Sequence, residues 1–387
     1  MKSVLRFRTV LIGLYLLILP IDATLGNILG PISLINYIVI FYVFIRLINL
    51  TTEGINLRLL ENCKVQILYF SYFILSISWS LSNHLNNWYI FSLMGSFLMF
   101  FFASIDTHTD KEYNFLKKMI IFSGAIVIII TILNLDLGSG ARFTLDFGRE
   151  MDPNYFSTGF ILITALLMDN ILKKKLLIFN LALLIAMLLV ILLTGSRGGL
   201  IANLFVIIVS IFINSKNNRI RNFIFMVSGS ILFIIAFSLV KNYIPEWVLS
   251  RFTIEEITVG GGSGRTEIWL ANLHYFEQMS FLGILFGNGF STFSYISSIS
   301  LGIARAPHSI YVQSLIEGGI FGLLITVFLI MSAMKRALSI NRKYIFAALC
   351  GAAVGGITLD IHVSRFLWMI LLFSMITIRK KTPNKFS

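Results

Sequence analysis

Charged residues and cysteines are scarce in this 387-residue sequence. Only 13% of its residues are charged, whereas a typical soluble domain has about 25%. Its two cysteines, Cys63 and Cys350, are too few for a disulfide framework or a cysteine metal cluster. The sequence also has no P-loop, no glycine pattern of a dinucleotide-binding fold and no HExxH zinc motif. We therefore expect neither a metal nor a cofactor.

Long apolar runs dominate what the sequence does contain. The mean hydropathy is +0.86, and stretches long enough to cross a bilayer as helices, roughly 18 residues or more, recur from end to end. The first run follows Lys2, Arg6 and Arg8 without a small-residue cleavage site, so we interpret it as a retained signal anchor. The sequence predicts an all-α polytopic membrane protein with a single transmembrane domain, residues 1–387. About twelve spans are expected, at 9–26, 28–48, 65–82, 88–105, 119–136, 154–171, 176–194, 198–214, 222–240, 309–333, 344–359 and 363–378.

Lysine and arginine are divided unevenly between the two sides of this bundle. With the N-terminus inside, 23 of the 31 basic residues fall in cytoplasmic segments, and each of these segments holds at least three. The positive-inside rule therefore predicts that both termini are cytoplasmic. The net charge of +13 does not indicate nucleic-acid binding, because the basic residues form short clusters between apolar runs. The basic residues left outside are Arg142, Arg149, Arg197, Lys241, Arg251, Arg265, Arg305 and Arg365.

Arginine dominates this outer set. Its planar fork binds phosphate in a bidentate way, and it stays charged when partly buried. The alternative for any single arginine is a pairing with an outer acid such as Asp152 or Glu267. Taken together, the outer arginines favour a site for an anionic substrate on the outer face.

Two outer segments are longer than the other connections. Residues 137–153 carry three acids and two arginines, and residues 241–307 are the longest stretch without a span. The second segment is too long for an idle linker, so we expect a large periplasmic loop between spans nine and ten that acts as a substrate-binding insertion. Within it, 265–280 has the apolar spacing of an amphipathic helix. Residues 281–296 are apolar but interrupted by glycines, and we expect them to lie at the membrane surface or to re-enter the membrane.

Three short outer motifs are candidates for a catalytic site. The sequence TGSRGG at 194–199 joins two spans without room for a loop, so Arg197 is expected at the outer membrane edge beside a helix N-terminus suited to an anion; the alternative is an arginine that snorkels to lipid phosphates. Arg265 opens a predicted helix after a run of glycines. His308 follows a proline at the mouth of a span, where an imidazole can take a proton from a hydroxyl or can simply cap the helix. We predict that these three residues are catalytic.

Other polar residues of the outer face are weaker candidates. Glu317 falls inside the membrane, and we interpret it as a buried acid paired with a neighbouring helix. Asp360 and His362 lie in the last outer turn and also suit a sugar or a phosphate. For each of these outer-turn residues the alternative is an ordinary surface side chain that does not take part in substrate binding. We assign to substrate binding Arg142, Arg149, Asp152, Asn154, Arg305, Tyr311 and Arg365.

Several of these motifs together resemble the O-antigen polymerase and O-antigen ligase superfamily. The features that carry the resemblance are SRGG at 196–199, GR followed by tryptophan at 264–269, GNGF at 287–290, PHSIYVQSLIEGGIFG at 307–322 and the Asp-Pro-Asn at 152–154. The resemblance covers the second half of the chain. One departure is Ser309, where many members have asparagine after the histidine.

The resemblance implies a metal-independent, inverting membrane glycosyltransferase related to the type C fold, located in the bacterial inner membrane with a periplasmic active site. Its donor is expected to be an oligosaccharide on undecaprenyl diphosphate. Arginines that match Arg197 and Arg265 are expected to hold the diphosphate, and the histidine that matches His308 to activate the acceptor hydroxyl.

The superfamily contains enzymes with two different acceptors. We favour a polymerase, because the Asp-Pro-Asn loop and the compact chain are more typical of it; the alternative is a ligase that transfers the glycan to lipid A core. Expected partners are the lipid-linked donor, the bilayer and a candidate chain-length regulator. A third alternative is a transporter of lipid-linked oligosaccharide. It is disfavoured because the charges gather at one face and the chain shows no two similar halves.

Overall fold

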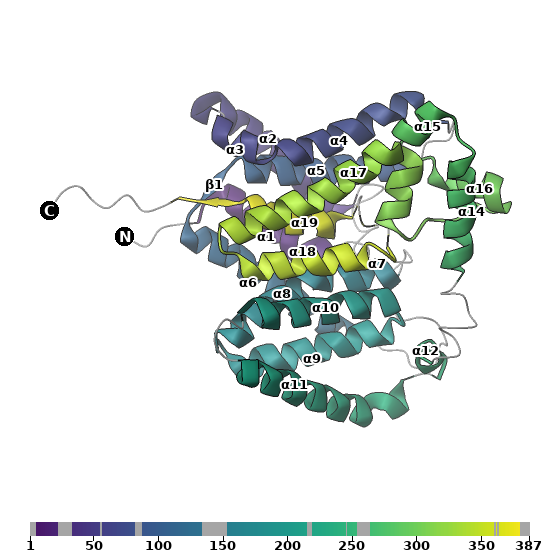
Figure 1. The fold of residues 1–387 in the computed structure, drawn as a ribbon. Coiled ribbons are helices and arrows are strands. Elements are labelled where there is room, and N and C mark those ends of the chain that lie inside the picture. The colour runs from purple at the N-terminus through teal and green to yellow at the C-terminus, as the bar shows by residue number, and fades with distance from the viewer. Residues whose placement is uncertain are drawn as a thin grey trace.

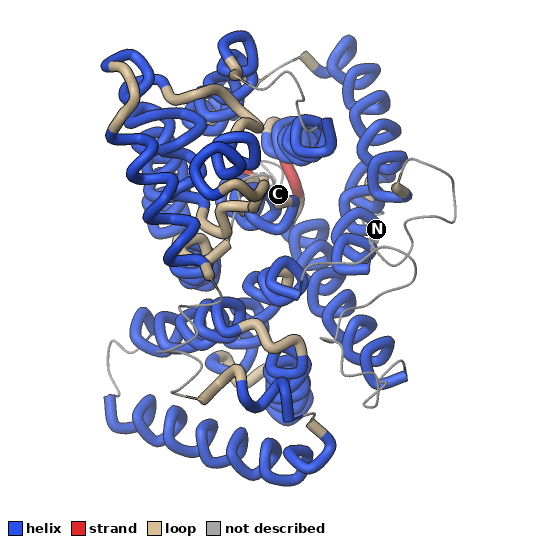
Figure 2. Tube along the Cα trace, turned by 90° about the vertical axis from the view of Figure 1, so that its right-hand side faces the viewer, coloured by secondary structure: helices blue, strands red, loops and turns tan. Residues whose placement is uncertain are grey.

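The fold is known from a computed structural model, which describes residues 5–21, 33–54, 56–81, 87–133, 153–214, 219–244, 246–253, 264–359, 361 and 364–379. Almost all of these residues lie in helices (Figure 2). The first half contains α1 Phe7–Ile18, η1 Leu19–Ile21, α2 Leu34–Glu53, α3 Leu57–Asn62, α4 Lys64–Ser76, η2 Ile77–Trp79, α5 Asn87–Ser104, β1 Thr107–His108, α6 Asp110–Leu133, α7 Pro153–Thr158, α8 Phe160–Leu172 and α9 Leu177–Leu193. The second half contains α10 Arg197–Asn214, α11 Arg219–Val240, η3 Lys241–Tyr243, α12 Glu246–Ser250, α14 Arg265–Glu277, α15 Phe281–Phe286, α16 Phe293–Leu301, α17 Ile310–Ser339, α18 Lys343–Gly355, α19 Arg365–Met375 and β2 Thr377–Ile378.

The predicted class, an all-α membrane protein, is confirmed. Among the described residues, five helices are long and apolar enough to cross a membrane: α2, α6, the α7–α8 pair, α10 and α17. Further apolar helices, such as those at Phe7–Ile21, Leu177–Leu193 and Arg365–Met375, are shorter. The apolar runs of the sequence therefore form helices, whereas the number of twelve spans stays a prediction.

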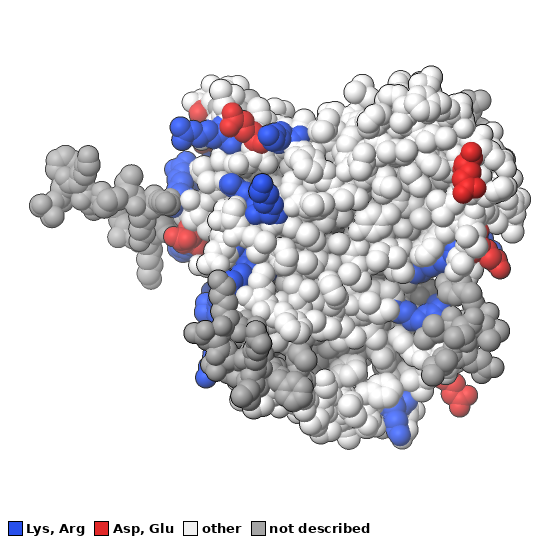
Figure 3. Space-filling model, viewed as in Figure 1, with Lys and Arg blue, Asp and Glu red and all other residues white. Residues whose placement is uncertain are grey.

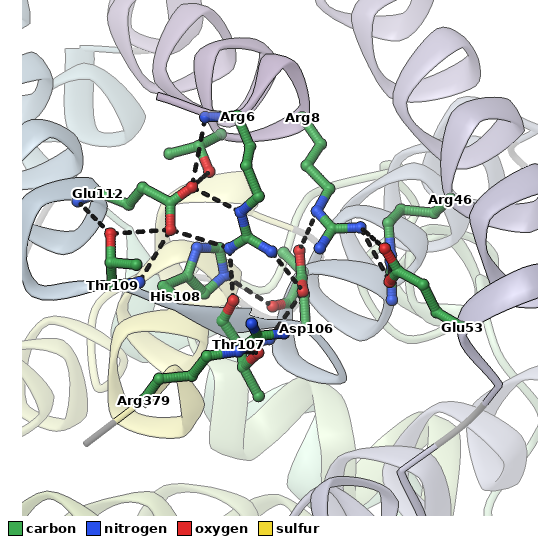
Figure 4. A network of polar contacts seen from close by, with 12 residues as sticks. Arg6, Arg8, Arg46, Glu53, Asp106, Thr107, His108, Thr109, Glu112 and Arg379 are labelled. Atoms are coloured by element: carbon green, nitrogen blue, oxygen red, sulfur yellow. Dashed lines mark hydrogen bonds and ion pairs between the residues drawn. The ribbon is translucent and has the colours of Figure 1, made fainter. Parts of the chain in front are cut away.

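One end of the bundle carries both termini and a network of ion pairs (Figures 1 and 4). Arg6 and Arg8 both reach Asp106, with N–O distances of 3.3 and 2.8 Å. Arg6 also pairs with Glu112, and Arg8 with Glu53. Below them β1 and β2 form a short parallel pair, which ties the connection between α5 and α6 to the chain after α19. We call this the terminal end. Four basic residues predicted to share one side of the membrane meet here: Arg6, Arg8, Arg46 and Arg379.

The opposite end of the bundle, which we call the loop end, carries α14 and α16 (Figure 1). On the face shown in Figure 3, charged side chains gather toward these two ends, and the surface between them is almost free of charge. An uncharged belt of this kind is what a membrane-spanning bundle presents to lipid.

Helices α10 and α18 pack antiparallel through small residues. A Cβ added to Gly351 would lie 3.0 Å from the carbonyl oxygen of Ala202, and a Cβ on Gly355 would lie 3.2 Å from the Cβ of the same alanine. Small residues let two helix backbones approach closely where lipid offers no hydrophobic drive for association. This close packing brings the start of α10 and the end of α18 together at the loop end.

Helix α17 is kinked at Gly319, whose φ of 63° and ψ of −163° are not helical. The turn after α15 docks at this kink: the amides of Asn288 and Gly289 donate to the carbonyl oxygens of Ile316 and Glu317, at 3.1 and 2.8 Å. The hydroxyl of Tyr72 in α4 donates to the carbonyl oxygen of Gly318 from the other side. The kink therefore has a definite cause, because carbonyl oxygens of α17 that lose their helical partners at Gly318 and Gly319 accept hydrogen bonds from the turn after α15.

The predicted loop at 241–307 is largely helical where the structure describes it. The expected helix from residue 265 is present as α14, though it ends at Glu277 and not at 280. Its Ile268 joins Phe293, Ile296 and Ile316 in an apolar cluster, with Trp269 packed against them. Helices α14 and α16 thus rest on the N-terminal half of α17 as a packed unit.

Candidate active site

The turn between α9 and α10 is held by a buried network of small polar side chains. The hydroxyl of Ser196 donates to Oδ1 of Asn154 at 2.9 Å, and the hydroxyl of Ser157 donates to Oγ of Ser196 at 3.0 Å. The amide of Gly199, in the first turn of α10, donates to the same serine oxygen at 3.2 Å. One turn further on, Asn203 Nδ2 donates to the carbonyl oxygens of Ser157 and Gly199. The Asp-Pro-Asn segment and the SRGG turn are therefore parts of one structure.

Glycine at position 198 lets two side chains approach the first turn of α10. The position that a Cβ would occupy there lies 4.0 Å from Nη1 of Arg265, and Thr358, just after α18, comes closer still. Arg265 is the first residue of α14 and is half-buried, as is Arg197. The two arginines predicted from separate motifs thus belong to the same end of α10.

A third arginine contacts the same turn. Nε of Arg251, which follows α12, donates to the carbonyl oxygen of Gly195 at 3.1 Å. Gly195 has a φ of 63°, a left-handed conformation that suits glycine and turns the chain from α9 into α10. Arg251 therefore helps to hold the turn that places Arg197 at the head of its helix.

His308 lies between two clamped stretches of backbone. On its N-terminal side, the carbonyl oxygen of Pro307 accepts a hydrogen bond of 2.7 Å from the indole Nε1 of Trp269. On its C-terminal side, Ser309 caps α17 through the amide of Val312, and the amide of Ile310 donates to two carbonyl oxygens at the end of α18, those of Gly356 and Leu359. His308 itself has a φ of 47°, which is unusual for a residue other than glycine.

These contacts close into a ring. Starting at Gly198 of α10, the ring passes to Arg265 and Trp269 of α14 and then to Pro307. It continues through Ile310 of α17 to the residues after α18, and Thr358 among them returns to Gly198. Segments that are far apart in the sequence therefore meet at the loop end, and His308 lies in the stretch of the ring between Pro307 and Ile310.

The chemistry available in this ring suits an anionic group next to a hydroxyl. The N-terminus of α10 carries the positive end of the helix dipole, which favours negative charge. Arg197 begins this helix and Arg265 approaches its first turn, so both add positive charge near it, and His308 adds an imidazole that can accept a proton. Among the described residues, no three or more histidines, cysteines or acids are arranged to hold a metal ion.

Residues 182–327 match a family model whose description is O-antigen ligase. This stretch of the chain is therefore similar to the O-antigen ligase family. The superfamily resemblance expected from the sequence is thereby confirmed. The match contains Arg197, Arg265 and His308, so each of the three motifs lies within the family domain. None of the curated proteins matches the chain.

Glu317, which lies within the family domain, has a structural partner. Its side chain is 1% exposed, and its Oε1 accepts a hydrogen bond of 3.1 Å from the amide of Phe293, the first residue of α16. A carboxylate is favourable at a helix N-terminus, where the amides lack partners within the helix. The interpretation of Glu317 as a buried acid paired with a neighbouring helix is confirmed.

The predicted substrate-binding residues are distributed over several places. Asn154 is buried and bonds Ser196. The hydroxyl of Tyr311 donates to the carbonyl oxygen of Ala353 in α18, at 2.9 Å. Nη2 of Arg365 donates to Oδ1 of Asn36 in α2 at 2.7 Å, so this arginine links α19 to α2. Arg305 is exposed in the connection before His308, and the predicted residues Arg142, Arg149, Asp152, Asp360 and His362 lie outside the described residues.

The sequence analysis missed several residues that shape the site. Asn203 and Ser157 are polar residues within predicted spans, and this could have marked them in the sequence. A polar side chain buried there needs a hydrogen-bond partner, and both are fully buried in the structure. Thr358 also falls in a predicted span, but only the packing of α18 against α10 brings it to Gly198. The role of Trp269 as a donor to Pro307 was equally invisible, although its motif was recognised.

Proposed function

We propose that this protein is an O-antigen polymerase, which joins oligosaccharide repeat units carried on undecaprenyl diphosphate at the periplasmic face of the inner membrane. The observation that carries the proposal is the ring at the loop end. It combines two arginines, a helix N-terminus and a histidine within an O-antigen ligase family domain.

The proposed reaction is a single displacement. The acceptor hydroxyl oxygen attacks the anomeric carbon of the growing chain, and the bond from that carbon to the diphosphate oxygen breaks with inversion. The hydroxyl proton passes to His308. Because Nδ1 of this histidine is buried, we assign the uptake of the proton to Nε2.

The arginines act on the leaving group. As negative charge builds on the diphosphate, Arg197 and Arg265 stabilise it with charge-assisted hydrogen bonds, and the positive end of the α10 helix dipole adds to this stabilisation. Donors that are already in place stabilise a developing charge without reorganisation, which is a large part of enzymatic rate enhancement. This arrangement needs no nucleotide, because the lipid diphosphate itself is the leaving group.

A ligase is the second candidate function, and the description of the matched family favours it. Both enzymes use the same donor and the same bond-breaking step, so the ring serves either. They differ in the acceptor, which is another lipid-linked glycan for the polymerase and lipid A core for the ligase.

A gel of lipopolysaccharide from a strain that lacks this gene separates the two. Core that carries a single repeat unit supports the polymerase, because ligation then continues without chain growth. Bare core with polymer retained on the lipid diphosphate supports the ligase. A normal ladder would contradict both.

Complementation of the same strain tests the site. We expect His308→Ala and Arg265→Ala each to lower transfer by about 100-fold or more, the usual loss when a general base or a charge-stabilising donor is removed. The matched controls are His274→Ala, on the exposed surface of α14, and Lys241→Ala, an exposed cation after α11. Activity near wild type in both site variants would refute the assignment.

A further inference from the structure

Trp269 makes a contact that its packing does not require. The indole ring of Trp269 lies against the apolar cluster formed by Ile268, Phe293 and Ile296, and any large apolar side chain would fill that place. Its indole N–H, however, donates to the carbonyl oxygen of Pro307 at 2.7 Å. An indole has one donor and no acceptor, so this bond uses the whole polar capacity of the side chain.

The acceptor of that bond belongs to the peptide unit that leads into His308. Fixing the Pro307 carbonyl fixes the plane of the peptide bond between the two residues, and so restrains φ of the histidine. That φ is 47°, in a region that residues with a side chain rarely adopt, and such conformations persist only where the surroundings hold them. The amide of Ile310 is held independently by carbonyl oxygens after α18. The histidine is thus restrained from both sides.

Helix α14 connects this restraint to the arginine site. Arg265 and Trp269 are four residues apart, one turn on the same face of the helix. Arg265 reaches toward the first turn of α10, while Trp269 reaches the backbone before His308. One rigid turn therefore sets the spacing between the group that binds the leaving diphosphate and the group that takes the proton.

We propose that Trp269 is a positioning residue for His308, and that its indole N–H holds the imidazole at the distance from Arg265 that transfer requires. This inference rests on the proposed function, in which His308 is the general base. Trp269 contacts neither the sugar nor the diphosphate in this role. It acts through the backbone carbonyl of Pro307.

The test removes the indole N–H of Trp269 and keeps an aromatic side chain. Trp269→Phe retains an aromatic side chain, and replacement of Trp269 by benzothienylalanine, in which sulfur takes the place of the N–H, retains the full bicyclic shape. Activity is measured as polymer formed by purified protein from the lipid-linked oligosaccharide that the deletion strain accumulates. We expect both variants to lower kcat by roughly 10- to 100-fold with little change in KM, because misplacement of a reacting group affects the chemical step.

A double-mutant cycle separates positioning from general structural damage. If Trp269 acts through His308, Trp269→Phe has no further effect on the residual activity of His308→Ala. Phe276→Leu, in the same apolar cluster but without a polar contact, is the matched control and should lower activity equally in both backgrounds.

The outcomes distinguish this inference from the proposed function. Wild-type activity of both Trp269 variants, together with an inactive His308→Ala, overturns the positioning role and leaves the function intact. An undiminished effect of Trp269→Phe in the His308→Ala background also overturns it. Wild-type activity of His308→Ala removes the proposed function, and the inference with it.

Discussion

Replacing Gly198 with alanine tests how closely the ends of α10 and α18 must approach. The new Cβ would lie 2.2 Å from Oγ1 of Thr358, whereas real Cβ atoms essentially never come within 3.0 Å of another heavy atom. Thr358 or the start of α10 must therefore move by about 1 Å, and a misplacement of that size in an active site costs on the order of 100-fold in rate. We expect kcat/KM for polymer formation by Gly198→Ala to fall by about that factor.

Folding should suffer much less than activity. Overpacking costs about 1–3 kcal/mol, and exchanging glycine for alanine in a helix returns up to about 1 kcal/mol. The thermal midpoint in detergent should therefore drop only modestly. The matched control is Gly229→Ala in α11, where an added Cβ meets nothing within 4 Å, and its activity should not change.

A second substitution checks the cause of the loss. In Gly198→Ala combined with Thr358→Ala, the close oxygen is gone and the nearest remaining threonine atom, Cβ, lies at 3.2 Å. The double variant should recover most of the activity, and Thr358→Ala alone should be close to wild type. Wild-type activity of Gly198→Ala, or a double variant no better than the single one, would refute the reasoning.

Three further predictions concern other parts of the bundle. Asp106→Asn removes one of the two acids that pair with buried Arg8, since Glu53 still pairs with it, and should lower the free energy of unfolding by about 1–3 kcal/mol; an unchanged stability in detergent unfolding would contradict a buried pair. Glu317→Ala leaves the amide of Phe293 without its acceptor and should cost about 1–3 kcal/mol, whereas Glu317→Gln keeps an acceptor oxygen and should unfold near the wild-type midpoint. Burial lowers the pKa of His108 below its ordinary 6.5, so the unfolded chain takes up a proton first and stability should fall as the pH drops below about 6.5; His108→Gln should flatten that dependence of the thermal midpoint.

Much of the secondary structure followed from local patterns. The apolar run from residue 309 is present as α17, but its N-cap is Ser309 and not His308, which the sequence offered as a capping residue. The helix that Arg265 opens was predicted because apolar spacing begins directly after a run of glycines. Boundaries were less accurate where a helix continues beyond its apolar part. Helix α17 ends at Ser339, six residues beyond the predicted span, because Lys335 and Arg336 continue the helix without being apolar.

Local sequence patterns said little about which residues contact one another in the folded chain. Arg365 was assigned to substrate binding from its place in an outer turn, yet it donates to Asn36, more than 300 positions earlier in the chain. The kink of α17 was equally hidden. Two successive glycines permit it, but the docked turn after α15 supplies the hydrogen bonds that stabilise it. No periodicity encodes such a contact, because it depends on two segments meeting in space.

The sequence by itself determined that this is a helical membrane protein, because a bilayer accepts only segments that are apolar and satisfy their own backbone hydrogen bonds. It also marked the arginine motifs, because positive charge on the predicted outer side opposes the insertion bias. The tertiary structure alone decided that Arg197, Arg265 and His308 belong to one ring. The contacts that close it run through glycines, a threonine and backbone carbonyls, and their positions depend on how α10, α14, α17 and α18 pack.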